Sequence, residues 1–179
     1  KAAREAGLAV IARMDINCTT KDMYDEFPQW YCRDIEGNPI LTQGRYTTCV
    51  NGGYYQKFIP QVFQEIIEKY HPDGFADNSW AGPGDRTICY CQNCQNKYWE
   101  KYHSKLPHKV DWNDSNYRQW IRWNYDIRLD NWNYFNKVTQ EYGGSNCLWF
   151  GMINGNPFQT GGRFYDIRRL IENAKFIFS

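Results

Sequence analysis

Four cysteines constrain the fold of this chain more than any other feature. Cys89, Cys91 and Cys94 fall in the segment Cys-Tyr-Cys-Gln-Asn-Cys, and Cys49 precedes them by forty positions. Four thiolates can close a tetrahedron around a zinc ion, and a full shell of protein ligands leaves no position for a reactive water. We therefore predict a structural zinc site formed by these four side chains. Disulfide bonds among the same cysteines are the alternative.

The other three cysteines do not extend this pattern. They are Cys18, Cys32 and Cys147, and they make the total seven. A secreted domain held together by disulfides is usually smaller, rich in loops and evenly paired. Metal binding is therefore the better interpretation of the four clustered cysteines.

The composition of the chain indicates which kinds of binding partner to expect. The net charge of +1 over 179 residues argues against nucleic acid. No apolar run approaches the roughly 20 residues of a membrane span, so we expect no membrane partner. Aromatic residues make up 18% of the chain, which suits an aromatic core or a carbohydrate site where rings stack on sugars. The compartment stays open between cytoplasm and periplasm.

Hydrophobic periodicity predicts alternating strands and helices. Expected strands cover residues 7–15, 75–77, 147–153 and 175–178, and expected helices cover 54–70, 91–102, about 115–142 and 164–173. In the first strand, one apolar face should pack on helices: Leu8, Val10, Ala12 and Met14. The opposite face should point inward: Ala9, Ile11, Arg13 and Asp15. The long connection 16–53 is expected to be an ordered loop because it is rich in aromatic residues and cysteine.

This order of elements implies parallel strands joined by right-handed crossovers. A complete (β/α)8 TIM barrel needs roughly 250 residues. We therefore expect an α/β fold: a partial barrel, about strands 3 to 6, with a zinc loop. The single domain 1–179 would be a fragment of a longer protein, which could form a homo-oligomer through other regions. A small doubly wound sheet is the alternative, although no Gly-x-Gly-x-x-Gly motif follows a strand.

Four segments carry a family resemblance that covers about residues 7–105. They are Phe27-Pro28-Gln29-Trp30, the stretch 45–51 followed by Tyr54-Tyr55, Asp77-Asn78-Ser79-Trp80, and the cysteine cluster. In this order they resemble motifs of clan A glycoside hydrolases, most closely the family 42 β-galactosidases and neighbouring uncharacterised families such as glycosyl hydrolase-like family 6. The resemblance implies a barrel, a zinc site and a pocket suited to sugars.

One residue departs from the family pattern. Ser79 stands where these enzymes carry the glutamate that acts as general acid and base, and their nucleophile would lie on a later strand beyond this chain. β-Galactosidase activity is therefore not implied. We predict a glycoside hydrolase-like protein that hydrolyses glycosidic bonds of a carbohydrate substrate. The alternatives are a non-catalytic carbohydrate-binding barrel and a small zinc-stabilised interaction domain.

Glycoside hydrolysis needs two carboxyl groups that flank the scissile bond. Asp77 and Asp15 end strands that we expect to be adjacent, about 4.8 Å apart, so both are candidate catalytic residues. An aspartate nucleophile at this strand end is also a feature of the similar α-fucosidases. Alternatively, Asp77 is a structural hydrogen-bond acceptor or binds sugar hydroxyls, and Asp15 pairs with Arg13. The candidate substrate-binding residues are Asn78, Trp80, Trp30, Asn51, Asn154 and Arg13.

Overall fold

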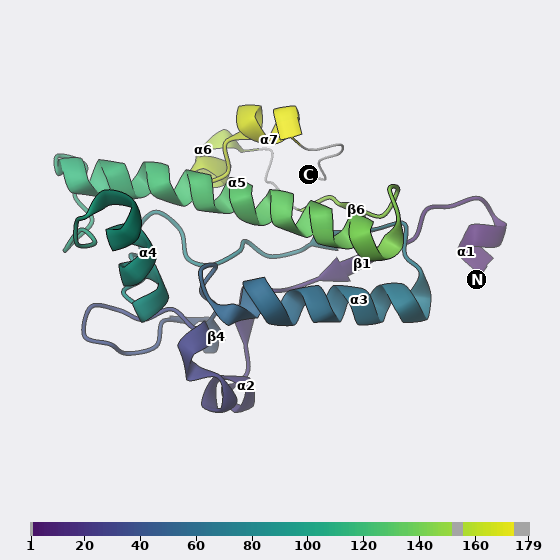
Figure 1. Cartoon of the computed structure of the whole chain (residues 1–179), viewed down its shortest axis with the longest axis horizontal. Coiled ribbons are helices and arrows are strands. Elements are labelled where there is room, and N and C mark those ends of the chain that lie inside the picture. Colours follow the sequence, from purple (N-terminus) through teal and green to yellow (C-terminus); the bar gives the residue numbers. More distant parts are fainter. Residues whose placement is uncertain (1, 152–155, 174–179) are drawn as a thin grey trace.

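A computed structural model describes residues 2–151 and 156–173 (Figure 1). The chain folds as a mixed α/β structure with two small sheets. Its strands are β1 (Ile11–Met14), β2 (Cys18–Thr19), β3 (Leu41–Thr42), β4 (Arg45–Thr47), β5 (Gly74–Asp77) and β6 (Leu148–Trp149). Its α-helices are α1 (Ala2–Glu5), α2 (Lys21–Glu26), α3 (Ile59–Tyr70), α4 (Gln92–Tyr102), α5 (Ser115–Gly143), α6 (Pro157–Gly161) and α7 (Ile167–Asn173).

The main sheet is parallel, as the order of elements predicts. Its strands lie in the order β1-β5-β6, with Met14 opposite Asp77 and Phe75 opposite Trp149. Two expected strands are longer than those observed, whereas β5 begins one residue before the expected strand 75–77. Residues 7–10 stay outside the first strand, and within the described residues 147–151 the strand β6 covers Leu148 and Trp149. Residues 152–155 and the expected strand 175–178 lie outside the described part of the chain.

Helices α3 and α5 run side by side and cover one face of this sheet (Figure 1). Aromatic rings fill the space between them: Phe63 lies 4.7 Å from Phe75 and 5.1 Å from Phe135, and Phe135 lies 5.0 Å from Trp149. The 3.6-residue period of α3 puts Phe63 on its buried face. This packing forms the first of two hydrophobic clusters.

The two faces of β1 differ as expected, with one exception. Ala12 and Met14 pack against the helical core, whereas Ile11 and Arg13 are exposed. Leu8 was expected on the buried face but is 62% exposed, because the chain there has not yet entered the sheet. The uncovered face of the sheet is thus the one predicted to point into a barrel.

The connection 16–53 is ordered, but it is not only a loop. It contains α2, a 3₁₀ turn over Pro28–Trp30 and the antiparallel sheet β2-β4-β3. Strands β3 and β4 are joined by Gln43 and Gly44, with φ values of 51° and 76°. Two central residues with positive φ are typical of the tight hairpin turns whose twist matches that of the strands.

Helix α5 begins where the sequence predicts. The Asp114 carboxylate caps it by accepting a 2.8 Å hydrogen bond from the Asn116 amide. The N-terminal part of α5 packs with α4 in a second hydrophobic cluster, which includes Tyr98, Tyr117 and Trp120. None of the described helices is long and apolar enough to cross a membrane.

The C-terminal part differs from expectation in one element. The predicted helix 164–173 is shorter, as α7, and α6 precedes it without having been predicted. Asn156 caps α6: its side-chain oxygen accepts from the amides of Phe158 and Gln159. Pro157 at the first helical position also favours a helix start here.

Candidate functional site

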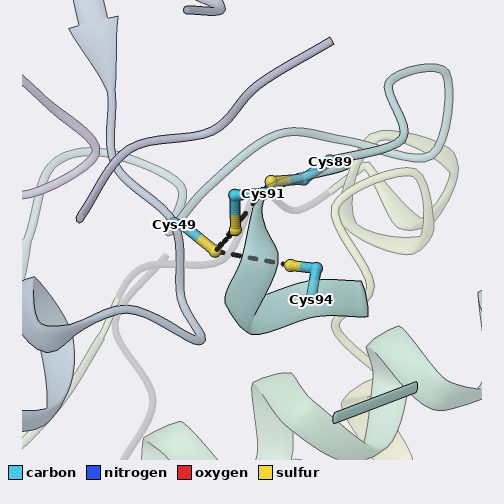
Figure 2. A group of neighbouring side chains, drawn as sticks. All are labelled: Cys49, Cys89, Cys91 and Cys94. Atoms are coloured by element: carbon cyan, nitrogen blue, oxygen red, sulfur yellow. Dashed lines mark hydrogen bonds between the residues drawn. The ribbon is translucent and has the colours of Figure 1, made fainter. Parts of the chain in front are cut away.

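The four predicted metal-binding cysteines lie together (Figure 2). The Cys49 sulfur lies 3.4 Å from those of Cys91 and Cys94 and 4.0 Å from that of Cys89, and all four lie within 4.8 Å of one another. Four sulfurs held 2.3 Å from one zinc ion would be separated by about 3.8 Å. These distances exceed the ~2.05 Å of a disulfide bond. The cluster is therefore spaced to hold a metal ion.

Local structure explains how the four thiols converge. Cys49 follows β4, and Cys91 is the extended residue immediately before α4, so its side chain lies at the helix N-terminus. Cys94 follows in the first turn. The partial positive charge of a helix N-terminus stabilises thiolates. The Asn51 amide adds a hydrogen bond of 3.3 Å to the Cys94 sulfur.

A fifth cysteine lies beside this cluster. Cys32 is fully buried, and its thiol donates to the Thr48 carbonyl at 3.4 Å. Hydrogen bonds from the thiols of Cys32, Cys91 and Cys94 lower the pKa of Cys49 to about 6. The antiparallel bridge between Tyr31 and Thr48 brings Cys32 here. Sequence spacing did not reveal it, because that pairing of distant segments has no local signal.

The carboxyl end of β5 holds a buried acid. Asp77 is 3% exposed, and its Oδ1 accepts hydrogen bonds from the Ser79 amide at 2.9 Å and the Ser79 hydroxyl at 2.8 Å. Burial raises the pKa of Asp77 to about 7, although the bonds from Ser79 oppose this and the charge of Asp15 adds to it. A carboxyl group with this pKa carries a proton for part of the time at neutral pH.

Ser79 is a connecting residue rather than a free hydroxyl. Its Oγ accepts hydrogen bonds from the amides of Ile16 at 2.9 Å and Asn17 at 3.2 Å while donating to Asp77. The side chain therefore joins the segment after β1 to the end of β5. Ser79, the residue that departs from the family motif in the sequence, therefore has a connecting role in this structure.

Asp15, Asn78 and Arg13 form an exposed chain at the same edge. The Arg13 guanidinium donates to the Asn78 carbonyl oxygen, and the Asn78 amide donates to Asp15 Oδ1 at 3.1 Å. An amide thus stands between Arg13 and Asp15, whose direct pairing was the alternative to a catalytic role for Asp15. Three of the predicted site residues therefore meet beside Asp77.

The remaining predicted substrate-binding residues are more dispersed. Trp30 stacks on Phe27 at 4.0 Å and packs against the core. The Asn51 amide donates to the Cys94 sulfur of the cysteine cluster. Trp80 packs on Tyr165 at 5.6 Å and lines a cleft of about 600 Å³ with the loop 83–87 and residues 158–163. Asn154 lies outside the described residues.

The comparisons with known proteins agree with this fold. A family model described as "Hypothetical glycosyl hydrolase 6" matches residues 1–79. No match is found among curated proteins. The fold resembles a β-galactosidase from the haloarchaeon Halorubrum lacusprofundi, with a TM-score of 0.71 and 14% identity over 97% of this chain and 30% of that one.

Two other solved structures are similar. A β-galactosidase from Rahnella sp. R3 has a TM-score of 0.65 and 16% identity over 98% of this chain and 29% of that one. An α-L-fucosidase isoenzyme from Paenibacillus thiaminolyticus has a TM-score of 0.57 and 20% identity over 90% of this chain and 23% of that one. The chain thus spans less than a third of the length of these three enzymes.

The resemblance to clan A glycoside hydrolases, including family 42 β-galactosidases, is therefore confirmed. At these identities the likeness shows the fold. The similar structures are TIM-barrel glycosidases. This chain is accordingly glycoside hydrolase-like in fold, with a cysteine cluster spaced to hold a metal.

Proposed function

We propose that this chain forms about strands 3 to 6 of a (β/α)8 barrel that binds and hydrolyses a glycan. Three parallel strands in chain order, with α3 and α5 on one face, support the barrel. In a complete barrel the other face would be covered by the remaining strands, and the substrate would bind at the carboxyl ends of the strands. Asp77, Ser79 and Asp15 all lie at that end.

The buried Asp77 carries the proposal of activity. Its raised pKa of about 7 suits a general acid, because such a group still holds a proton to give to the leaving oxygen at neutral pH. Asp15 supplies the second carboxyl group that glycoside hydrolysis needs. Arg13 and Asn78 hold Asp15 and offer further hydrogen bonds to sugar hydroxyls.

Aromatic residues would position the substrate. Trp80 lines the cleft beside this edge and presents a ring on which a sugar can stack. Trp30 would contribute a second ring at the rim, although its stacking on Phe27 also stabilises the core. The Asn51 amide would act on the metal cluster rather than on the glycan, because it donates to Cys94.

The metal would be a structural zinc ion held by Cys49, Cys89, Cys91 and Cys94. Four buried sulfurs match the soft, closed donor set that zinc prefers. Such an ion would supply no reacting water. Its contribution would be to attach the connection that carries Cys49 to the start of α4.

A second candidate function is glycan binding without hydrolysis. Ser79 supports it, because a serine that already accepts two backbone hydrogen bonds cannot replace the family's glutamate as an acid. In that case Asp77 would bind a sugar hydroxyl or only stabilise the strand end. Turnover is the observation that separates the two functions.

The test uses the intact protein as its gene encodes it. Release of nitrophenol from a panel of nitrophenyl glycosides would be measured for the wild type and for Asp77→Asn, with glycan binding measured in parallel. Hydrolysis requires that Asp77→Asn lower kcat by at least a hundredfold, since general acid catalysis contributes roughly 10²–10⁴-fold. Asp25→Asn is the matched control, because Asp25 is exposed and pairs only with Lys21.

The possible outcomes are distinct. Turnover that is lost in Asp77→Asn while glycan binding persists would support the hydrolase. Binding without turnover in the wild type would favour the second function. Turnover unaffected by Asp77→Asn would overturn the role of Asp77.

A further inference from the structure

The interior next to the proposed glycan cleft contains an arginine without a counter-ion. Arg128 of α5 is 1% exposed, and no carboxylate within the described ranges lies at ion-pair distance from it. Its Nη2 donates to the Pro83 carbonyl at 3.0 Å, whereas Nε and Nη1 have no hydrogen-bond partner. A buried, unpaired charge is costly unless a nearby negative group offsets it.

The chain is built closely around this guanidinium. A Cβ on Gly82, which has φ of 66°, would lie 3.0 Å from Arg128 Nη2, so a larger residue here would be strained and would displace the guanidinium. On the other side the guanidinium lies 5.5 Å from the Phe164 ring centre. Phe164 itself has φ of 66°, an unusual conformation for a bulky residue. Arg128 is therefore held in a defined position behind Pro83, which forms part of the wall of the cleft.

A second arginine lies on the open side of this wall. Arg163 lines the cleft, and a Cβ on Gly84 would lie 3.6 Å from its Nε. No ion pair or side-chain hydrogen bond within residues 2–151 and 156–173 engages its guanidinium. Burial and the charge of Arg128 both lower the pKa of Arg163, which means that the two guanidinium groups repel each other. Their combined positive potential faces the cleft.

The charged residues that line the cleft give it a net positive charge. Asp85 and Arg86 both line it, so they offset each other formally, and Arg163 remains in excess. Asp85 is not within ion-pair distance of Arg163. Trp80 supplies an aromatic face in the same cleft. The cleft thus combines a stacking ring with an unpaired guanidinium.

We propose that this cleft binds an acidic sugar, whose ring stacks on Trp80 while its carboxylate pairs with Arg163, with Arg128 adding positive potential from behind Pro83. A planar guanidinium matches the geometry of a carboxylate and can bind it through two hydrogen bonds. A uronic acid unit would supply that carboxylate. This inference rests on the proposed function, because it names the class of glycan that the protein recognises.

The test measures binding of matched pairs of probes to the intact protein by calorimetry. Oligogalacturonate and oligoglucuronate are each compared with the carboxyl-reduced form, which keeps the sugar backbone but lacks the charge. A sulfated galactan oligosaccharide is included. We expect one carboxylate probe to bind at least tenfold more tightly than its reduced form, since hydrogen bonds to charged groups are worth at least that factor.

Two variants test whether the preference for the carboxylate probe over its reduced form arises in this cleft. Arg163→Gln should abolish the preference for the carboxylate with an unchanged melting temperature. Arg168→Gln is the matched control, because Arg168 is an exposed arginine on α7 outside this cleft. A preference that persists in Arg163→Gln would overturn the proposal.

The remaining outcomes separate this inference from the proposed function. Equal or tighter binding of the reduced probes would overturn the acidic-sugar assignment and leave glycan binding intact. Binding of the sulfated probe alone would overturn the carboxylate assignment and identify a sulfated sugar as the ligand. Failure to bind every glycan, here and in the nitrophenyl glycoside experiment, would overturn both.

Discussion

Replacing Asp77 by asparagine should remove a large part of the pH dependence of stability. Burial raises the pKa of this carboxyl group from 3.8 to about 7 in the folded chain. Between these values the folded state holds a proton that the unfolded state has lost, so the stability that Asp77 contributes is fully present below pH 4 and is lost as pH rises through 7. At about 1.4 kcal/mol for each pH unit, the free energy of unfolding falls by about 4 kcal/mol in all as Asp77 loses its proton.

Urea unfolding followed by tryptophan fluorescence at pH 5 and pH 8 measures the effect. From pH 5 to 8 the wild type should lose about 3 kcal/mol that Asp77→Asn does not lose. The asparagine keeps an oxygen to accept the hydrogen bonds from Ser79. Asp25→Asn is the control, because it makes the same chemical change at an exposed site.

Metal content is measured at both pH values, so that loss of the ion at pH 5 is not mistaken for titration of Asp77. If Asp77→Asn and the wild type lose the same free energy between pH 5 and pH 8, the raised pKa is refuted. Asp77 would then be ionised at neutral pH and could not act there as a proton donor.

Three further changes test other parts of the structure. Cys91→Ser should release the metal and lower the melting temperature, as measured by elemental analysis and calorimetry, whereas Cys18→Ser outside the cluster should keep the metal. Ser79→Ala leaves the amides of Ile16 and Asn17 without an acceptor and should cost about 2 kcal/mol of unfolding free energy in urea. Phe63→Ala, which empties a fully buried ring position, should cost about 3–5 kcal/mol in the same assay; a loss below 1 kcal/mol would contradict the packing described.

The elements that were predictable from sequence are those with local signals. Helix α5 has a capping aspartate, a sustained period and a terminal Gly143, so its bounds agree with expectation. The cysteine cluster was predictable because three of its members fall within six residues. The small antiparallel sheet was not, because strands of two or three residues have no detectable period and form only through pairing of distant segments.

The candidate site also has features that could be predicted from local sequence and features that could not. The position of Asp77 at a strand end followed from the apolar run before it. Its burial and its bonds to Ser79 depend on how the segment after β1 folds over β5, which no local pattern records. Arg128 is a similar case: a polar residue on a long helix is ordinarily solvated, and here the loop after β5 and the Phe164 ring both lie against it.

Helix α5 belongs to both hydrophobic clusters, and this joint membership has a consequence for cooperativity. Its 29 residues extend about 43 Å, from Tyr117 and Trp120 beside the cysteines to Phe135 against the sheet. Neither cluster can lose its packing without exposing part of this helix. The cysteine cluster and the sheet should therefore melt in a single calorimetric transition, and removal of the proposed metal by a chelator should shift that whole transition instead of splitting it.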